Sequence, residues 1–358
     1  MLTWSTERSA PLDDSIRELA AETAKRHLAQ GPESFGYRKV GRSQCEEDTE
    51  YHLCFLSEAI TTGRPSLFAR YVDWRASMLA SRGIEPQEFA RKLELLRGVV
   101  QERLPEPTSA VASEIITSAL ARTRGQLPDI PTFLPDSAPH VEVARTFLNL
   151  LLSGRRDQAA EMLSELMAKG MALGVICQSI IEPSQREVGR LWQMNRITAA
   201  HEHYCTQAVQ WTMTRLTAAA VRTPKRDRRV IAASVANEYH DVGIRMLADL
   251  MELDGWEVFY LGANTPGAAL FQLASVLRPD VIALSATMPF NIESVRQTTV
   301  AVNALVPKAT VIVGGQAFAN EPDVWEHTEA DAYAQNAAEA VDVIDSLVDG
   351  GQKFAASD

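Results

Sequence analysis

The fold is decided by the stretch Val230-Ile231-Ala232-Ala233-Ser234-Val235-Ala236, which is followed after one residue by Glu238-Tyr239-His240-Asp241-Val242-Gly243. An uninterrupted apolar run of this length is typical of a strand that is buried on both faces of a sheet. A helical pattern begins near Val242, directly after the loop. The stretch therefore predicts a strand, a loop that carries His240, and an amphipathic helix.

The same alternation continues along the rest of the chain. Strand-like runs lie at 229–235, 256–261, 280–284, 309–313 and 331–333, and helical patterns lie at 242–254, 266–277, 291–305 and 336–348. This alternation predicts an α/β fold with a doubly wound parallel sheet, Rossmann-like, over residues 229–350. Such sheets bind ligands outside the carboxyl ends of their strands, where His240 is expected to lie.

Residues 140–222 are predicted to form a four-helix bundle. Its first helix has apolar residues at i, i+3, i+4 and i+7, namely Ala144, Phe147, Leu148 and Leu151, and short connections between the helices favour antiparallel packing. A charged linker at 223–229 separates the bundle from the sheet domain. The segment 127–139 is rich in proline and is predicted to be the linker before the bundle.

The first 126 residues are predicted to form an all-α domain. Helical patterns lie at 13–30, 48–62, 65–82, 86–104 and 109–124, with Pro near the first turn or Gly after the last. One of these helices has an aromatic stripe of Phe68, Tyr71, Val72, Trp74 and Met78. The domain order is thus a helical domain, a helical bundle and a parallel sheet.

Composition narrows the class of protein. The 358 residues have a net charge of −11, which disfavours a nonspecific nucleic-acid binder. No apolar run is long enough to span a membrane, and the first residues lack the pattern of a signal peptide, so we expect a cytoplasmic protein. The four cysteines form no C-x-x-C pair, which favours buried thiols over disulfides or a zinc site.

Three groups of residues are expected to meet at one edge of the sheet. Besides His240, they are Ser285 and Thr287 after the third strand, and Gly314-Gly315 after the fourth. An imidazole is a good ligand for a transition metal, and either Glu238 or Asp241 could hold its second nitrogen. Paired glycines let a large flat group approach the backbone.

The pattern E-x-H-x-x-G, S-x-T, G-G resembles the cobalamin-binding domain of methionine synthase and of corrinoid proteins. The resemblance implies that His240 is the lower ligand of cobalt, with Glu238, Asp241 and Gly243 beside it. It also implies that the nucleotide tail of cobalamin enters the sheet past Ser285, Thr287, Gly314 and Gly315. Two positions differ from the usual form, because Glu238 stands in place of Asp and Thr287 in place of Leu.

The bundle carries a second motif, Trp192 followed after nine residues by Glu202-His203. His201 and His203 cannot share a metal, because residues two apart on a helix point about 200° apart. W-x9-E-H resembles the cap of CarH-type photoreceptors, and this implies that Trp192, Glu202 and His203 cover the upper face of adenosylcobalamin. Gln193 stands where those receptors have a histidine that binds cobalt after illumination. A tryptophan in a bundle core is the simpler alternative.

CarH-type repressors have a helix-turn-helix domain, but the N-terminal part of this chain has no basic recognition helix. It is instead similar to photocobilins, in which a globin-like domain binds a bilin. The resemblance implies a biliverdin site with the candidates His52, Tyr51, Phe55, Tyr71, Trp74 and Arg70. Further basic residues that could meet propionates are Arg38, Lys39, Arg42, Arg64 and Arg75. Ordinary core packing also explains the aromatic residues.

These resemblances predict a light-sensing signalling protein and not an enzyme. Light is expected to cleave the cobalt–carbon bond of adenosylcobalamin and to change the conformation or the assembly of a homo-oligomer. Any effector is expected to act in trans or to have been removed. Two alternatives are a corrinoid protein that carries methyl groups for a methyltransferase and a cobalamin-dependent transcriptional regulator.

Overall fold

The computed structural model describes residues 6–30, 41–123 and 130–350. The chain divides into two compact units. The first comprises residues 1–130 with 193–196, and the second comprises residues 131–192 with 197–358. Residues 127–129 of the predicted linker, together with Arg38 and Lys39, lie outside the described residues.

The first unit is helical, as predicted. Its helices are α1 (Thr6–Asp13), α2 (Ile16–Ala29), α3 (Arg42–Thr61), α4 (Pro65–Ala80), α5 (Pro86–Arg103) and α6 (Thr108–Thr123). Helix α1 was not predicted, and it contains Pro11, which is a weak signal for helix. Helix α3 begins six residues before the predicted start at Asp48, because its first turns are polar and carry no apolar stripe. The globin-like arrangement stays a prediction.

Packing in the first unit centres on α3. This helix contacts α1, α2, α4 and α6, and α5 packs against α2 and α6. The largest fully buried apolar side chains of the unit are Phe68, Phe89, Leu12, Leu19, Leu53, Leu56, Ile60, Leu67 and Leu93. Burial of these side chains from several helices gives the unit a core of its own.

The second unit begins with a helical cap formed by α7 (Val141–Leu152), α8 (Arg156–Ala168), α9 (Leu173–Ile176), α10 (Glu182–Gln193) and α11 (Ala199–Ala219). A π-helical turn, Cys177–Ile181, joins α9 to α10. Residues 173–193 therefore form one continuous helical segment, which corresponds to the third of the four predicted helical stretches. The turn was not predicted. It lies just before Pro183, which lacks the N–H that an α-helix would direct to the carbonyl four residues earlier.

The segment that leads into the cap is attached to it. The Thr132 hydroxyl and the Phe133 N–H both donate to Glu187, at 3.1 and 3.0 Å, and Leu134 is buried in the core of the cap. The proline-containing residues from 131 onward thus pack on the bundle.

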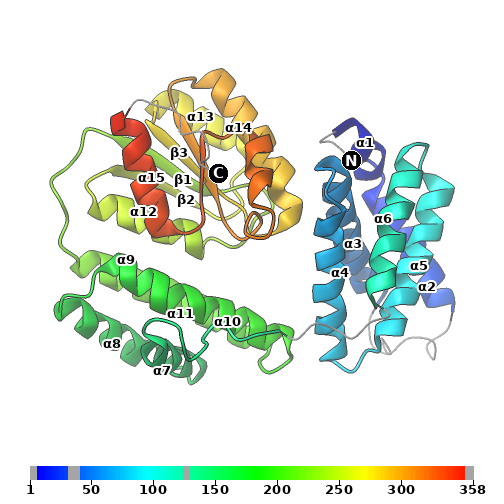
Figure 1. Ribbon diagram of the computed structural model, residues 1–358, viewed down its shortest axis with the longest axis horizontal. Helices are drawn as coiled ribbons and strands as arrows, with labels where there is room; N and C mark the ends of the chain where they lie inside the picture. Colours follow the sequence, from blue (N-terminus) through cyan, green and yellow to red (C-terminus); the bar gives the residue numbers. More distant parts are fainter. Residues whose placement is uncertain (1–5, 31–40, 124–129, 351–358) are drawn as a thin grey trace. The chain divides into compact units, whose positions relative to one another are not determined.

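The parallel sheet of the second unit follows the prediction closely. Its strands are β1 (Arg229–Ser234), β2 (Glu257–Gly262), β3 (Val281–Ser285), β4 (Thr310–Gly314) and β5 (Ala332–Ala334), in the order β2-β1-β3-β4-β5. The helices are α12 (Val242–Leu253), α13 (Gly267–Leu277), α14 (Ile292–Leu305) and α15 (Ala337–Gly350). Figure 1 shows α12 and α15 on one face of the sheet and α13 and α14 on the other. Two 3₁₀ turns, Pro289–Asn291 and Pro322–Thr328, complete the connections.

The cap and the sheet domain share a core. Met246 of α12 is buried in the same cluster as Phe147, Ile180 and Met213 of the cap, and Leu250 packs against that cluster. Helix α11 therefore lies along α12, which places the cap beside the loop that precedes α12. Within the described residues, no helix combines the length and the apolar character needed to cross a membrane.

Candidate functional site

Strands β1, β3 and β4 end level with one another. Ser234 pairs with Ser285, and Ser285 pairs with Gly314. Because the strands are parallel, the segments that follow them lie at one edge of the sheet. The fold therefore brings the His240 loop, the segment after Ser285 and the Gly314-Gly315 pair together, as the spacing in the sequence predicts.

His240 is held by Glu238. Its Nδ1 lies 2.6 Å from Glu238 Oε1, and the same oxygen accepts the His240 backbone N–H at 3.0 Å. The imidazole side chain is 59% exposed, whereas the Glu238 side chain is completely buried. The Ser234 hydroxyl donates to the His240 carbonyl at 3.0 Å, which fixes the loop to the end of β1. With Nδ1 engaged, Nε2 is the ring nitrogen that can coordinate a metal.

Glu238 also joins the His240 loop to the segment after β3. Its Oε2 accepts the backbone N–H groups of Thr287 and Met288, at 2.7 and 2.8 Å, and the Asn291 side-chain amide at 3.0 Å. The role of Asn291 was not predicted, because an asparagine at the N-cap of a helix, here α14, is usually explained by capping. Both carboxylate oxygens are thus occupied by donors, which explains how a buried glutamate can remain charged.

The electrostatics of the pair match this geometry. The hydrogen bond to Glu238 raises the pKa of His240 against the opposing effect of burial, and the negative charges of Glu202 and Asp241 contribute in the same direction as the hydrogen bond. Burial alone would raise the pKa of Glu238, but hydrogen bonds from His240 and the Met288 backbone lower it overall.

The three glycines of the pattern, Gly243, Gly314 and Gly315, differ in whether the fold itself requires a glycine at that position. A Cβ on Gly315, whose φ is +105°, would lie 2.3 Å from the Ala286 carbonyl oxygen, and a Cβ on Gly314 would lie 2.9 Å from that of Ala334. Only glycine allows this close approach of backbones. A Cβ on Gly243 would meet no atom within 4 Å, so the protein itself does not require glycine there. The exposed imidazole and the open space at Gly243 together fit a large flat group that carries a metal.

The cap motif lies at the end of α10 and the start of α11. Glu202 Oε1 accepts the Thr206 hydroxyl at 3.0 Å, and Glu202 Oε2 lies 2.8 Å from His203 Nδ1. Thr198 caps α11 through the His201 N–H, so His201 serves the helix terminus. His203 is exposed and Trp192 is half-buried.

The bilin candidates in the first unit separate into two groups. His52, Phe55 and Tyr71 are buried together: His52 Nδ1 lies 2.5 Å from the Tyr71 hydroxyl, and the Phe55 and Tyr71 rings stack at 3.9 Å. The Trp74 ring stacks on that of Tyr71, with 6.2 Å between the ring centres. Tyr51 is 53% exposed, in contrast to the buried rings, and Arg70 is half-buried. The rings fill the core against one another, which is the packing alternative that the sequence also allows.

A buried charge cluster beside His52 was not predicted. The Asp48 carboxylate forms ion pairs with Lys92, at 2.5 Å, and with Arg75, and it lies 3.6 Å from His52 Nε2. Burial lowers the pKa of His27 to about 4, and the positive charge of Lys92 contributes to the shift. The sequence hardly indicates this charge cluster, because Asp48 and His52 are the only two of its members that are spaced as neighbours on one helix.

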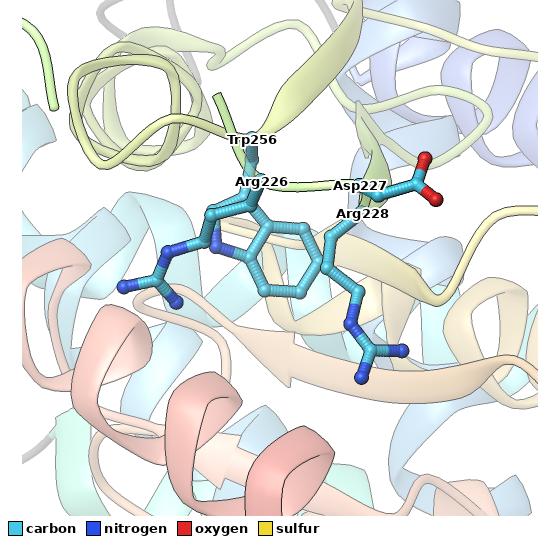
Figure 2. A pocket seen from close by; sticks show the side chains of 4 residues that line it. All are labelled: Arg226, Asp227, Arg228 and Trp256. Carbon is cyan, nitrogen blue, oxygen red and sulfur yellow. The ribbon is translucent and has the colours of Figure 1, made fainter. Parts of the chain in front are cut away.

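A separate pocket lies near the start of β1 and β2, at the edge opposite the His240 loop. It has a volume of about 580 Å³ and is lined by Arg226, Asp227, Arg228 and Trp256. In Figure 2 the Asp227 carboxylate and the Arg226 guanidinium point in opposite directions. Arg226 pairs with Asp254 and Asp345, and Arg228 pairs with Asp280. The arginines are thus neutralised by the protein, and the site at the carboxyl edge remains the stronger candidate.

Comparison with known proteins supports that choice. Residues 228–342 match the B12 binding domain, and residues 143–217 match a second B12 binding domain. The HTH-type transcriptional repressor CarH of Myxococcus xanthus is 26% identical over 193 residues, which cover 53% of this chain and 64% of CarH. Dimethylamine corrinoid protein 2 of Methanosarcina acetivorans is 24% identical over 192 residues, which cover 52% of this chain and 83% of that protein.

A solved structure, the monomethylamine corrinoid protein of Methanosarcina barkeri, has the same fold. It superposes with a TM-score of 0.50 at 20% identity, covering 57% of this chain and 98% of that protein. The chain spans less than two thirds of the length of CarH and about half of the related repressor CarA. Residues 143–342 are thus a cobalamin-binding module, related at low identity to CarH and to methylamine corrinoid proteins.

Proposed function

We propose that this protein is a photoreceptor that binds adenosylcobalamin, with His240 as the lower ligand of cobalt and Trp192, Glu202 and His203 over the upper face. The observation that carries the proposal is the exposed imidazole of His240, whose Nδ1 is bound by a buried glutamate at the edge of the sheet. Cobalamin, when bound, supplies a cobalt–carbon bond that light can cleave. The protein holds the imidazole in place through Glu238, and the space around Gly243 is open.

The first experiment tests cobalamin binding. Purified protein is mixed with adenosylcobalamin in the dark, and absorption spectra report whether an imidazole coordinates cobalt. The wild-type protein should show imidazole coordination, and His240→Ala should lose it and bind cobalamin at least about tenfold more weakly. His140→Ala removes another exposed imidazole of the same unit and serves as the matched control. Unchanged spectra in His240→Ala would show that another group is the lower ligand.

The second experiment tests the response to light. Dark-loaded protein is illuminated with green light while its spectrum and its oligomeric state, by light scattering, are followed. We expect the wild-type protein to lose the adenosyl group and to change its assembly. Trp192→Ala should alter both responses. The relation to CarH and the Trp192, Glu202, His203 motif support it. A loaded protein whose spectrum does not respond to light would refute light sensing while leaving cobalamin binding intact.

A methyl carrier is the second candidate function, favoured by the relation to dimethylamine corrinoid protein 2. Protein loaded with methylcobalamin should then support methyl transfer to an acceptor in the presence of a methyltransferase. A cobalamin-dependent transcriptional regulator is the third, because CarH is a repressor. It would shift DNA in a gel, with an affinity that falls steeply as salt rises.

We extend the proposal to a bilin, biliverdin, in the first unit. The buried cluster of His52, Phe55, Tyr71 and Trp74 supports it, because a planar ligand could replace part of the ring stacking. Co-expression with a source of biliverdin should give protein with bilin absorbance, and Phe55→Ala should weaken it. Protein that stays colourless in the bilin region after co-expression would remove biliverdin from the proposal.

A further inference from the structure

A line of polar contacts joins the cap to the His240 loop. We call it the helix seam, and it consists of Gln210 and Thr214 on α11, of Asp241 at the start of α12 and of Arg245 on α12. The spacing on each helix is close to one turn, so each residue of α11 lies opposite one residue of the α12 side. The seam runs beside the apolar contact of Met213 and Met246.

The contacts of the seam are specific. The Gln210 amide donates to Asp241 Oδ1 at 2.6 Å, and the Arg245 guanidinium donates to Thr214 at 3.3 Å and to Asp249 at 2.9 Å. Burial raises the pKa of Asp249, and the hydrogen bond and charge of Arg245 oppose this shift. A slide of α11 along α12 by one turn would break the Gln210–Asp241 and Arg245–Thr214 contacts, so the seam fixes the register of the two helices.

Asp241 is the residue where the seam reaches the site. Its two carboxylate oxygens accept from different elements: Oδ1 from Gln210 of α11, and Oδ2 from the Tyr260 hydroxyl of β2 at 2.8 Å. The Arg245 guanidinium lies over the Tyr260 ring, 5.4 Å from its centre, and holds the ring in place. Asp241 directly follows His240 in the chain, so its position constrains the loop that carries the imidazole.

We propose that Gln210 and Tyr260 are positioning residues that act on His240 through Asp241. Helix α11 carries Glu202 in its first turn and Gln210 two turns later, so one rigid element joins the residues proposed to cover the upper face to the loop of the proposed lower ligand. A displacement of the cap then moves the His240 loop through Asp241. In the same way, dissociation of His240 from cobalt allows the cap to move. This inference rests on the proposed cobalamin function.

The test uses the full chain and three variants. Gln210→Leu and Tyr260→Phe each remove one donor to Asp241 at nearly constant volume. Thr214→Val is the matched control, because it removes a contact of the same seam that does not involve Asp241. In the protein without cobalamin, hydrogen exchange of the amides at 236–243 should become faster by on the order of tenfold in the first two variants and stay unchanged in the control.

A second readout uses hydroxocobalamin as the probe. At fixed pH, the absorption spectrum gives the fraction of protein in which an imidazole coordinates cobalt, and the lower ligand should dissociate about tenfold more readily in Gln210→Leu and Tyr260→Phe than in Thr214→Val. Equal loop exchange and equal spectra in all three variants would overturn the inference, and the seam would then serve stability alone. If the wild-type protein shows no imidazole coordination, the proposed function fails, while the exchange experiment still tests the coupling.

Discussion

Single residues of the site divide into those that the fold itself needs and those that it does not. Gly315 belongs to the first group, since its φ of +105° and the nearby Ala286 carbonyl exclude a side chain. Gly243 belongs to the second, because a Cβ there meets open space. Both are glycines of one sequence pattern, and only the coordinates separate their roles.

This difference gives a paired prediction. Gly315→Ala should destabilise the protein by at least about 2 kcal/mol, because it adds backbone strain and a contact with a carbonyl. Gly243→Ala lies in a helix and should be neutral or stabilising by up to about 1 kcal/mol, yet should weaken cobalamin binding if the corrin occupies the open space. Urea unfolding and cobalamin titration measure the two effects. Normal binding by a stable Gly243→Ala would show that the corrin does not approach this residue.

Glu238 is the residue on which the site depends most. Glu238→Gln keeps the shape but places an amide opposite some of the donors that now meet a carboxylate, so we expect lower stability. The pKa of His240 should fall in the variant, because the hydrogen bond that raises it is lost or weakened. Titration of the imidazole by NMR in the cobalamin-free protein checks this. A pKa that does not fall would mean that another group sets the charge of His240.

At the scale of elements, helix α11 has the decisive place, since it begins with the cap motif and continues into the helix seam. Its start is fixed by a capping box. The Thr198 hydroxyl accepts the His201 backbone N–H, and the His201 ring nitrogen Nδ1 accepts the Thr198 backbone N–H. Residues of the first turn, among them Glu202, depend on this cap for their position.

Thr198→Ala should therefore cost about 1 kcal/mol of stability and should loosen the first turn of α11. Hydrogen exchange at 199–203 and thermal unfolding measure the two effects. Ser346→Ala is a suitable control, because the Ser346 hydroxyl bonds only within its own helix, to the Asp342 carbonyl. Faster exchange spread evenly over the unit, with none concentrated at the first turn, would argue against a specific role of the cap.

At the scale of the whole molecule, the first unit contains neutral histidines in a charged core. Burial lowers the pKa of His27 to about 4 and that of His52 well below its usual value, whereas Lys92 and Arg75 help to keep Asp48 ionised. In the unfolded chain these histidines bind protons near pH 6.5. The unfolded state therefore binds more protons than the folded state between about pH 6.5 and pH 4.

The folded state should thus lose stability as the pH falls through this window, by up to about 3 kcal/mol for His27 alone. Urea unfolding of the full chain at several pH values measures the slope. His27→Leu removes this titrating group from the core and should flatten the slope between pH 6.5 and pH 4. A slope that is equal in the wild type and His27→Leu would show that His27 does not contribute.

The order of helices and strands could be read from the sequence because it depends on local patterns. Apolar runs gave β1 to β5 within a residue or two, and proline and glycine marked many helix ends. Helix α1 and the π-helical turn before Pro183 were missed, because a short helix has little periodicity and a π turn keeps an almost helical pattern. The convergence of His240, Ser285 and Gly314 followed from the rule for parallel sheets.

What the sequence alone determined is the parallel sheet, the helical regions before it and the position of His240 at the carboxyl edge, because strand alternation and helical periodicity are properties of neighbouring residues. Only the tertiary structure decided which donors meet Glu238, which glycines are required, and that Gln210 and Tyr260 hold Asp241. Apart from the His240–Glu238 contact, those contacts join residues from 19 to 53 positions apart, such as Tyr260 with Asp241 and Asn291 with Glu238. No local pattern specifies such pairs, since packing of whole elements brings them together.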